Sequence, residues 1–512
     1  MDNEKELHLD KRLDTFVNIQ RKTVQAQKHQ NSKLKDVTKW PLIRSWFFES
    51  IVNYYSLDMS YVFSTKLDIK SLEKALSHVL GYYPALAGRI HYRGFYEDQY
   101  VDLNNEGVDF IVCQQPDIGY EELVGSDVDQ EFTMKRGRYC EILNGDTIVS
   151  GQAPLLTLKL TLLEKGGCVL GICISHSIVD GGAFSLFMKD LSRLYQDPNI
   201  EIESILKPNE LYSRMSSTSE EISHSAKILK VNPSSILKSF LMRQMYSWAF
   251  YFLRKQKARH PEHCPPRYRL QFSKEELLYI KQKGTEKVQK VSQDNWISTN
   301  EALLVHFWTM LLDVCQLPDE KRKDLGISMI INPRARTKLC AERVLGSIGF
   351  GVNYAIDMSS TALPNKYAQV HEFCRWAVSD EVVSASITML ESGMSRNRFD
   401  PIYVNSRTSS ELPYGLSRWN LNPQTLEKGN TFGQPIKNLA GSQSWNTGEV
   451  YKVVMRVDGG CDAYINMSQS PIMGNMISNW PLVRLIGPAE FFNKLSLHHD
   501  EWKKQIARSR SK

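Results

Sequence analysis

The chain has 512 residues, of which 42% are hydrophobic and 23% are charged, as is ordinary for a globular protein. This length exceeds what one hydrophobic core usually supports, so we expect two domains. The formal net charge is only +6, from 63 basic and 57 acidic residues, which is too mild over this length to indicate a nucleic-acid partner.

The nine cysteines are dispersed without paired spacing, a pattern typical of reduced thiols in the cytosol. Residues 1–30 lack an apolar segment, so we expect no secretory signal. The most apolar internal run, 245–253, is far shorter than the roughly 20 residues that span a bilayer. These features predict a cytoplasmic chain with no membrane span, and the basic residues from Lys503 onward are interpreted as a solvated tail.

Strands and helices are predicted to alternate along the first part of the chain. Residues 1–40 are polar and are interpreted as a peripheral helix or arm, and organisation begins with a strand at 61–67. Asp68 is a good N-cap for the next helix, which Gly81 ends. Residues 155–163 and 168–174 predict two strands joined by a tight glycine turn. The apolar positions of the helix recur at helical spacing and are Leu72, Ala75, Leu76, Val79 and Leu80.

An irregular region, 201–266, separates this part from a second one and contains a polar patch at 216–221 and a helix at 236–253. A strand at 267–272 and a helix from Lys274 follow it, and Ser298 to Glu301 form a capping box before an apolar helix. Residues 326–331 predict another strand. We therefore expect an α/β chain that is divided into an N-terminal arm, 1–40, a first domain, 41–205, a crossover, 206–266, and a second domain, 267–512.

The sequence His176-Ser177-Ile178-Val179-Asp180-Gly181 stands between a predicted strand and a predicted helix. Such a turn fixes the rotamer of an imidazole and leaves one ring nitrogen open, as a general base requires. A neutral imidazole with a pKa of about 6.5 accepts a proton at physiological pH. His176 is therefore the candidate base, although an isolated histidine is more often structural.

Two other patterns are interpreted as structural. His260, His263 and Cys264 lie close together, but no fourth ligand is near and the flanking prolines indicate a loop, so we expect no metal site. The glycines at 346, 349 and 351 lack the G-x-G-x-x-G order and predict a turn, not a dinucleotide-binding loop.

Five segments form an ordered set of motifs over roughly residues 60–470. They are Tyr83 to Arg89 (Y-P-x-L-A-G-R), His176 to Gly181 (H-x-x-x-D-G), Ser298 to Leu303, Asn332 to Arg336 (N-x-R-x-R), and Gly349 to Asn353 (F-G-N with one residue inserted). This set resembles the BAHD branch of the CoA-dependent acyltransferase superfamily. The resemblance implies an α/β fold of two domains like those of chloramphenicol acetyltransferase, each a mixed sheet flanked by helices.

One element departs from the family pattern. The family carries D-F-G-W-G near its C-terminus, whereas this chain has Thr431-Phe432-Gly433-Gln434-Pro435, with Thr431 in place of the aspartate and no tryptophan. In the family this element is structural, so the departure concerns the subfamily more than the chemistry.

The resemblance also implies roles for single residues. His176 would be the base that takes the proton of the acceptor, and Asp180 would form a structural ion pair with Arg334, although a triad role for Asp180 stays open. Gly181, with its neighbour Gly182, is interpreted as the backbone freedom that closes the turn. Trp419 lies where the family has a segment that lines the substrate pocket.

The expected co-substrate is acyl-CoA, and the expected acceptor is the hydroxyl or amine of a small molecule, with no permanently bound cofactor or metal and a monomeric chain. Two alternatives stay open. A condensation-type enzyme would take the acyl group from a carrier protein, but that branch usually carries a second histidine where this chain has Ser175. A binding module that kept the fold and lost the reaction is the other alternative.

Overall fold

The computed structural model describes sixteen segments of the chain, and the statements below concern these residues. They are 12–27, 38–42, 56–91, 100–124, 137–207, 218–229, 267–291, 296–323, 325–334, 341–362, 365–396, 432, 436–440, 452–455, 458–466 and 485–510.

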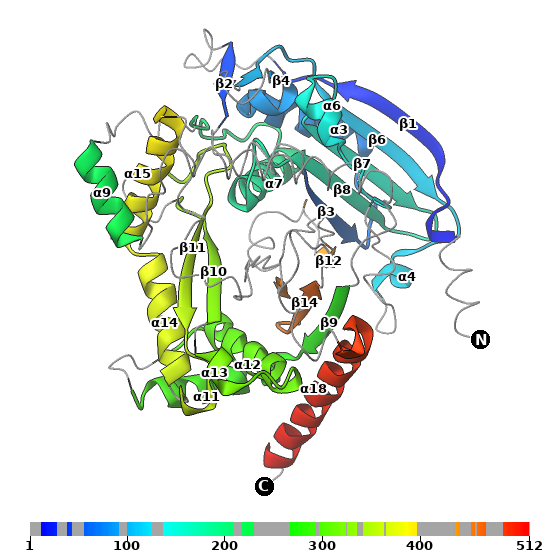
Figure 1. Cartoon of the computed structure of the whole chain (residues 1–512). Helices are drawn as coiled ribbons and strands as arrows, with labels where there is room; N and C mark the ends of the chain where they lie inside the picture. The colour runs from blue at the N-terminus through cyan, green and yellow to red at the C-terminus, as the bar shows by residue number, and fades with distance from the viewer. Residues whose placement is uncertain are drawn as a thin grey trace.

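A six-stranded mixed sheet forms the centre of the first part (Figure 1). Only β6 and β7 run parallel, and every other neighbouring pair is antiparallel. In spatial order the strands are β1 (Val17–Val24), β6 (Val108–Gln115), β7 (Leu156–Leu163), β8 (Cys168–Ser175), β3 (Ser56–Phe63) and β12 (Ile436–Ala440).

Helices α3 (Ile69–Tyr82) and α7 (Gly181–Gln196) pack against each other and cover one face of this sheet (Figure 1). The side chain of Asp68 accepts a hydrogen bond from the Ser71 N–H and caps α3, as predicted. The predicted apolar positions of α3 are all buried, because residues one turn apart share the face that meets the core. The remaining elements of this part are β2 (Lys39–Pro41), η3 (Pro84–Ala87), β4 (Arg89–His91), β5 (Tyr100–Asp102), α4 (Tyr120–Val124) and α6 (Gly145–Val149).

Two strands of the sheet lie outside the predicted first domain. Residues 17–24, expected as a peripheral helix or arm, instead form the edge strand β1, because their backbone pairs with the free edge of β6. The strand β12, from the second part of the chain, pairs antiparallel with β3 at the opposite edge. The first sheet thus contains strands from both parts of the chain.

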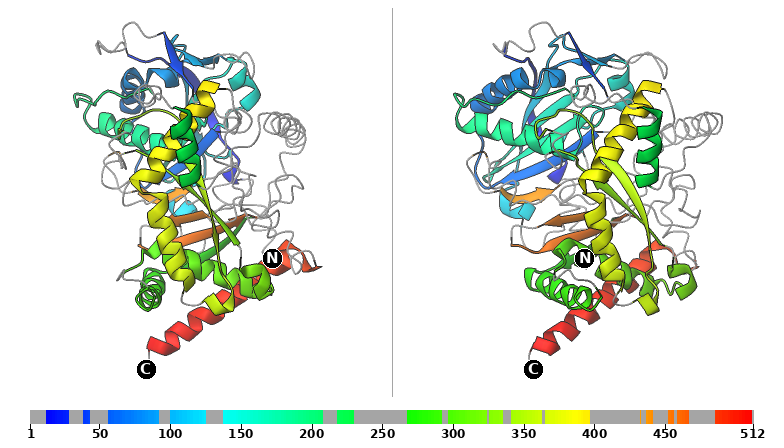
Figure 2. Two further views of the ribbon diagram at one scale, coloured as in Figure 1. Left: turned by 60° about the vertical axis from the view of Figure 1, so that its left-hand side comes forward. Right: turned by 90° about the vertical axis from the view of Figure 1, so that its left-hand side faces the viewer.

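The second part carries two antiparallel strand groups with helices packed around them. The elements of the second part are β9 (Arg267–Phe272), α11 (Lys274–Val288), α12 (Thr299–Val314), α13 (Asp319–Arg322), β10 (Leu325–Ile331), β11 (Phe350–Ile356), η4 (Ser360–Ala362), α14 (Asn365–Ala377), α15 (Asp380–Arg396), β13 (Lys452–Met455), β14 (Cys461–Asn466) and α18 (Pro488–Arg510). The antiparallel pair β10–β11 extends from the helices α12 and α13 toward α7 (Figures 1 and 2). The capping box predicted at Ser298 and Glu301 begins α12.

The buried apolar side chains form two large clusters, one in each part of the chain. The first contains the residues between the sheet and the helices α3 and α7, together with Leu345 and Phe432 from the second part. The second contains the buried faces of α11, α12, α14 and α18. Each large cluster therefore lies mainly in one part of the chain.

Part of the predicted crossover is helical. The polar patch at 216–221 was expected to be a turn, but Thr218 and Glu221 form a capping box that starts α9 (Ser219–Ile228). This helix packs on α15 and buries Ala226 and Leu229 in the second core. The predicted helix at 236–253 lies outside the described residues.

Acid should loosen the contact between α12 and α18, because the half-buried His306 lies there with a buried ring nitrogen. Its ring centroid lies 4.3 Å from that of Trp502, and its Nε2 atom is buried with no hydrogen-bond partner in the described structure. Burial, aided by the nearby His499 and His498, lowers the pKa of His306 to about 3. Below pH 6.5 the unfolded chain therefore binds a proton that the folded chain excludes, and stability is lost as the pH falls.

We expect the free energy of unfolding to fall by about 2 kcal/mol between pH 7 and pH 5 through this one group. Urea unfolding of the unmodified chain and of His306→Leu at both pH values measures the effect. The variant should lose less stability than the unmodified chain, and equal losses would contradict the assignment.

Candidate active site

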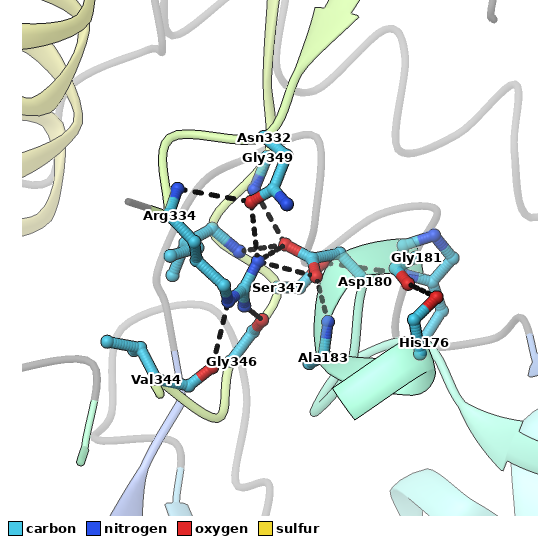
Figure 3. Close-up of polar contacts among 12 residues, drawn as sticks. His176, Asp180, Gly181, Ala183, Asn332, Arg334, Val344, Gly346, Ser347 and Gly349 are labelled. Atoms are coloured by element: carbon cyan, nitrogen blue, oxygen red, sulfur yellow. Dashed lines mark hydrogen bonds and ion pairs between the residues drawn. The ribbon is translucent and has the colours of Figure 1, made fainter. Parts of the chain in front are cut away.

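The candidate site lies where β8 ends and α7 begins (Figure 3). The strand β8 is fully buried and ends at Ser175, and α7 begins at Gly181. His176 is half-buried on the turn between them, whereas Ser175 and Ser177 on either side are buried and hydrogen-bond each other at 2.7 Å. The turn thus has fixed neighbours on both sides of the imidazole.

Asp180 is the N-cap of α7, and donors from both parts of the chain surround its carboxylate. The Ala183 N–H donates to Oδ1 at 2.9 Å, and Arg334 Nη1 donates to both oxygens at 2.8 and 2.9 Å. The backbone N–H groups of Ile348 and Gly349 each donate to Oδ2 at 3.0 Å. Burial alone would raise the pKa of Asp180, but the charge and hydrogen bonds of Arg334 outweigh it and hold that pKa below its usual value.

Arg334 reaches Asp180 from the turn after β10 and is itself held by several acceptors (Figure 3). Its Nε donates to the Val344 carbonyl at 3.0 Å and its Nη2 to the Gly346 carbonyl at 2.7 Å. Asn332 Oδ1 accepts from both Arg334 Nη1 and the Arg334 N–H. The resemblance implied this ion pair, and it joins residues 154 positions apart in the sequence.

The environment of His176 favours a neutral imidazole. Loss of hydration lowers the pKa of His176, while hydrogen bonding to its own backbone oxygen, the charge of Asp180 and the backbone oxygen of Val179 act in the opposite direction. The hydroxyl of Ser347 lies 3.3 Å from His176 Nδ1. A neutral imidazole carries a hydrogen on one ring nitrogen and a lone pair on the other, and Ser347 lies on the Nδ1 side of this ring.

The expected backbone freedom at the start of α7 is not found at Gly182. Its φ lies outside the left-handed region, and a Cβ at this position would stand 2.6 Å from Asn332 Nδ2 and 2.8 Å from Arg334 Nη1. Gly182 therefore allows the two parts of the chain to approach closely. Gly181 is the first residue of α7, and its carbonyl accepts from the Ser185 hydroxyl at 2.9 Å.

A second polar contact, which was not predicted from the sequence, joins the loop at 341–349 to α7. Asp190 is fully buried, and its Oδ2 accepts from the Tyr83 hydroxyl and from Arg343 Nη2, both at 2.6 Å. Burial and the neighbouring Asp190 raise the pKa of Tyr83, so the phenol stays protonated and donates. Arg343 also donates to the Glu203 carbonyl at 3.1 Å.

A signal for Asp190 was present in the sequence. An acidic residue at this position falls on the apolar face of α7, three residues after Phe187, and a buried charge normally requires a partner. Ser347 had no such signal, because it stands in an irregular segment without periodicity.

Removing Arg343 should destabilise the fold strongly, because the buried carboxylate of Asp190 would lose the cation that hydrogen-bonds it, while Arg193 Nη1 stays 3.9 Å from its other oxygen. We expect Arg343→Ala to lower the free energy of unfolding by about 3–5 kcal/mol. Arg21→Ala is the matched control, since Arg21 pairs with Asp109 and Glu141 but is half-exposed, and should cost about 0–1 kcal/mol. Denaturant unfolding measures both variants, and equal small losses would contradict the role of the Asp190 contact.

A family model described as Transferase family matches residues 47–470, which is most of the chain. The chain belongs to this family. The match confirms the resemblance to BAHD-type acyltransferases that the ordered motifs suggested.

The curated relatives of this family member are matched over part of their length. The chain is 31% identical over 128 residues to akuammiline synthase 2 of Alstonia scholaris, which is 25% of this chain and 26% of the relative. It is 21% identical over 335 residues to coumaroyl-CoA:anthocyanidin 3-O-glucoside-6''-O-coumaroyltransferase 2 of Arabidopsis thaliana, which is 64% of this chain and 66% of the relative.

Solved structures show the same fold. Vinorine synthase matches with a TM-score of 0.59 at 14% identity, over 92% of this chain and 97% of that one. TRI101 of F. sporotrichioides, solved with coenzyme A and T-2, matches with a TM-score of 0.54 at 15% identity, over 84% of this chain and 95% of that one. These likenesses confirm the expected α/β fold of two domains like those of chloramphenicol acetyltransferase.

Phe432, the described residue of the divergent family element, packs against the first sheet and α7. Its ring meets Phe63 and Tyr195 edge to face at 5.8 and 5.5 Å, and its N–H donates to the Ser192 hydroxyl at 2.9 Å. These contacts are those of a packing residue. Thr431, Arg336 and Trp419 lie outside the described residues.

Two features are absent from the described segments. They contain no group of three or more His, Cys, Asp or Glu side chains placed to hold a metal ion. None of their helices is long and apolar enough to cross a membrane. His260, His263 and Cys264 lie outside these segments.

Proposed function

We propose that this chain is an acyl-CoA-dependent acyltransferase that moves an acyl group from a CoA thioester to a hydroxyl or amine of a small molecule. The observation that carries the proposal is the placement of His176 on the turn after β8, with its Nδ1 side held by Ser347 and a lowered pKa. A relative whose name states a coumaroyl-CoA donor and a glucoside acceptor supports this reaction class.

In this proposal Nε2 of His176 takes the proton of the acceptor hydroxyl or amine as the acceptor oxygen or nitrogen attacks the thioester carbonyl. The carbonyl π electrons move to its oxygen, and a tetrahedral intermediate forms. When the C–S bond breaks, the thiolate leaves and takes the proton from the His176 imidazolium. The products are the acylated acceptor and free CoA, and the imidazole returns to its neutral form.

Asp180 acts as structural support in this mechanism. Four N–H groups donate to its two oxygens in five contacts, and one of these groups belongs to the Arg334 guanidinium that neutralises its charge. A carboxylate so engaged holds the turn and the loop after β10 together. The charge of Asp180 also raises the pKa of His176, which opposes the effect of burial.

A free-thiol release assay tests the proposal. Acyl-CoA donors of different chain length and an aromatic acyl-CoA are combined with a panel of alcohols and amines, and thiol release and acylated product are both measured, with His176→Ala alongside. Product and thiol should appear together and depend on His176. If no pair gives His176-dependent product, the binding-module alternative is favoured instead.

The same assay with an acylated carrier protein as the donor tests the condensation alternative. The first condensation domain of the calcium-dependent antibiotic synthetase matches with a TM-score of 0.52 at 13% identity, which shows the fold alone. Transfer from an acylated carrier protein but not from acyl-CoA would contradict the proposed donor.

Three further expectations from the sequence are proposals. They are the lining of the acceptor pocket by Trp419, a monomeric state and a cytoplasmic location. Trp419→Ala kinetics, light scattering and cell fractionation test them in turn.

A further inference from the structure

Ser347 contacts the candidate base on the Nδ1 side of its ring. The side chain is buried, with 2% of its surface exposed, and its hydroxyl lies 3.3 Å from His176 Nδ1 (Figure 3). It belongs to the loop at 341–349, which comes from the second part of the chain, whereas His176 comes from the first.

The donor in this contact follows from the proposed role of His176. In the proposed mechanism Nε2 takes the proton of the acceptor, so Nε2 holds the lone pair of the neutral ring and Nδ1 carries the hydrogen. The Ser347 oxygen, 3.3 Å from Nδ1, then accepts from Nδ1–H.

Several anchors place Ser347. Val344 and Gly346, just before it, accept from Arg334, and the N–H groups of Ile348 and Gly349, just after it, donate to Asp180. Because both flanks of Ser347 are bound, its position relative to His176 has little freedom.

Contacts at the beginning of the loop add to this restraint. Arg343 binds the buried Asp190 at 2.6 Å, and the Leu345 N–H donates to the Leu206 carbonyl at 3.1 Å. Asp180, whose charge acts on His176, is paired with Arg334, and the group that faces Nδ1 is the neutral hydroxyl of Ser347.

We propose that Ser347 is a positioning residue for the acyl transfer: it holds the His176 ring with Nδ1–H directed at its hydroxyl and strengthens this bond when the ring becomes charged. The inference rests on the proposed function. Before proton transfer the His176 ring is neutral, and so is its hydrogen bond to Ser347. Once Nε2 has taken the proton the bond is charge-assisted, and a charge-assisted bond is about twice as strong as a neutral one.

Ser347→Ala tests the proposal against Ser359→Ala. Ser359 is also buried, in the second part of the chain, and its hydroxyl hydrogen-bonds Thr361 at 3.1 Å, so the control loses a comparable bond away from His176. We expect Ser347→Ala to lower kcat about tenfold and to shift the acid limb of the pH profile of kcat/KM about one unit lower, because the imidazolium loses an acceptor. Ser359→Ala should change neither, and both variants should unfold at similar temperatures.

Nitrogen-15 NMR of labelled histidines gives a readout that does not depend on activity, with the His176 signals assigned by their loss in His176→Ala. The Nδ1 and Nε2 shifts should report Nδ1–H in the unmodified chain and a lower titration midpoint in Ser347→Ala. If Ser347→Ala fails to fold, Ser347→Cys keeps a weaker acceptor of similar size and should show smaller changes in the same direction.

The outcomes separate this inference from the proposed function. If His176→Ala abolishes product formation while Ser347→Ala changes neither the pH profile nor the His176 shifts, the inference is overturned and the proposed function stands. If Ser347→Ala moves the His176 shifts but His176→Ala keeps full activity, the positioning stands and the proposed function fails.

Discussion

Replacing His176 by alanine is expected to lower kcat/KM for acyl transfer by about a hundredfold to ten-thousandfold, the usual contribution of a general base. The loss should appear with every competent donor and acceptor, because the base serves the transfer and not the recognition of one substrate. The folded chain should survive, since His176 is half-buried and the Asp180–Arg334 pair beside it stays intact.

His91→Ala is the matched control for this variant. His91 is also a half-buried histidine of the first part, stacked on Tyr100 at 4.7 Å in the small sheet of β2, β5 and β4. Thermal unfolding and steady-state kinetics of both variants are compared. A His176→Ala enzyme that keeps more than a tenth of the activity would remove His176 from the chemistry.

Asp180→Asn is expected to destabilise the chain by about 3–5 kcal/mol, because the change leaves the buried Arg334 charge uncompensated. The amide also offers one acceptor oxygen where the carboxylate offers two, and its NH₂ group would face the Arg334 guanidinium or the N–H groups of Ile348 and Gly349. Loss of soluble protein should therefore accompany loss of activity. Denaturant unfolding and the soluble yield measure the effect.

The matched control is Asp109→Asn, which removes a carboxylate paired with the half-exposed Arg21 and should cost about 0–1 kcal/mol. If Asp180→Asn is as stable as this control while its kcat collapses, Asp180 belongs to the chemistry, and the triad interpretation replaces the structural one.

Local patterns were sufficient to predict the elements that position the site. The apolar run of β8, the tight turn before it and the helix that follows Asp180 appear where they were predicted, and so does the capping box of α12. Periodicity and capping are local properties, which explains this success. The edge strand β1 was missed because the alternation of Val17 and Ile19 with polar residues stops after Gln20 and is too short to predict a strand.

Contacts between distant segments were less accessible from the sequence. The Asp180–Arg334 pair was expected because a family resemblance implied it, since nothing local relates residues 154 positions apart. Ser347 was missed because its role depends on the path of a loop that the Arg334 and Arg343 contacts set. The use of Gly182 for close approach also depends on the partner, since a turn glycine and a contact glycine look alike in a sequence.

The pH dependence of kcat/KM for acyl transfer tests the central claim most directly. We predict that activity falls on the acid side with a midpoint below pH 6.5, because burial lowers the pKa of His176 and the base works only when neutral. The residual activity of His176→Ala should lack this acid limb. An acid limb that persists unchanged in His176→Ala would show that another group is the base and would contradict the account.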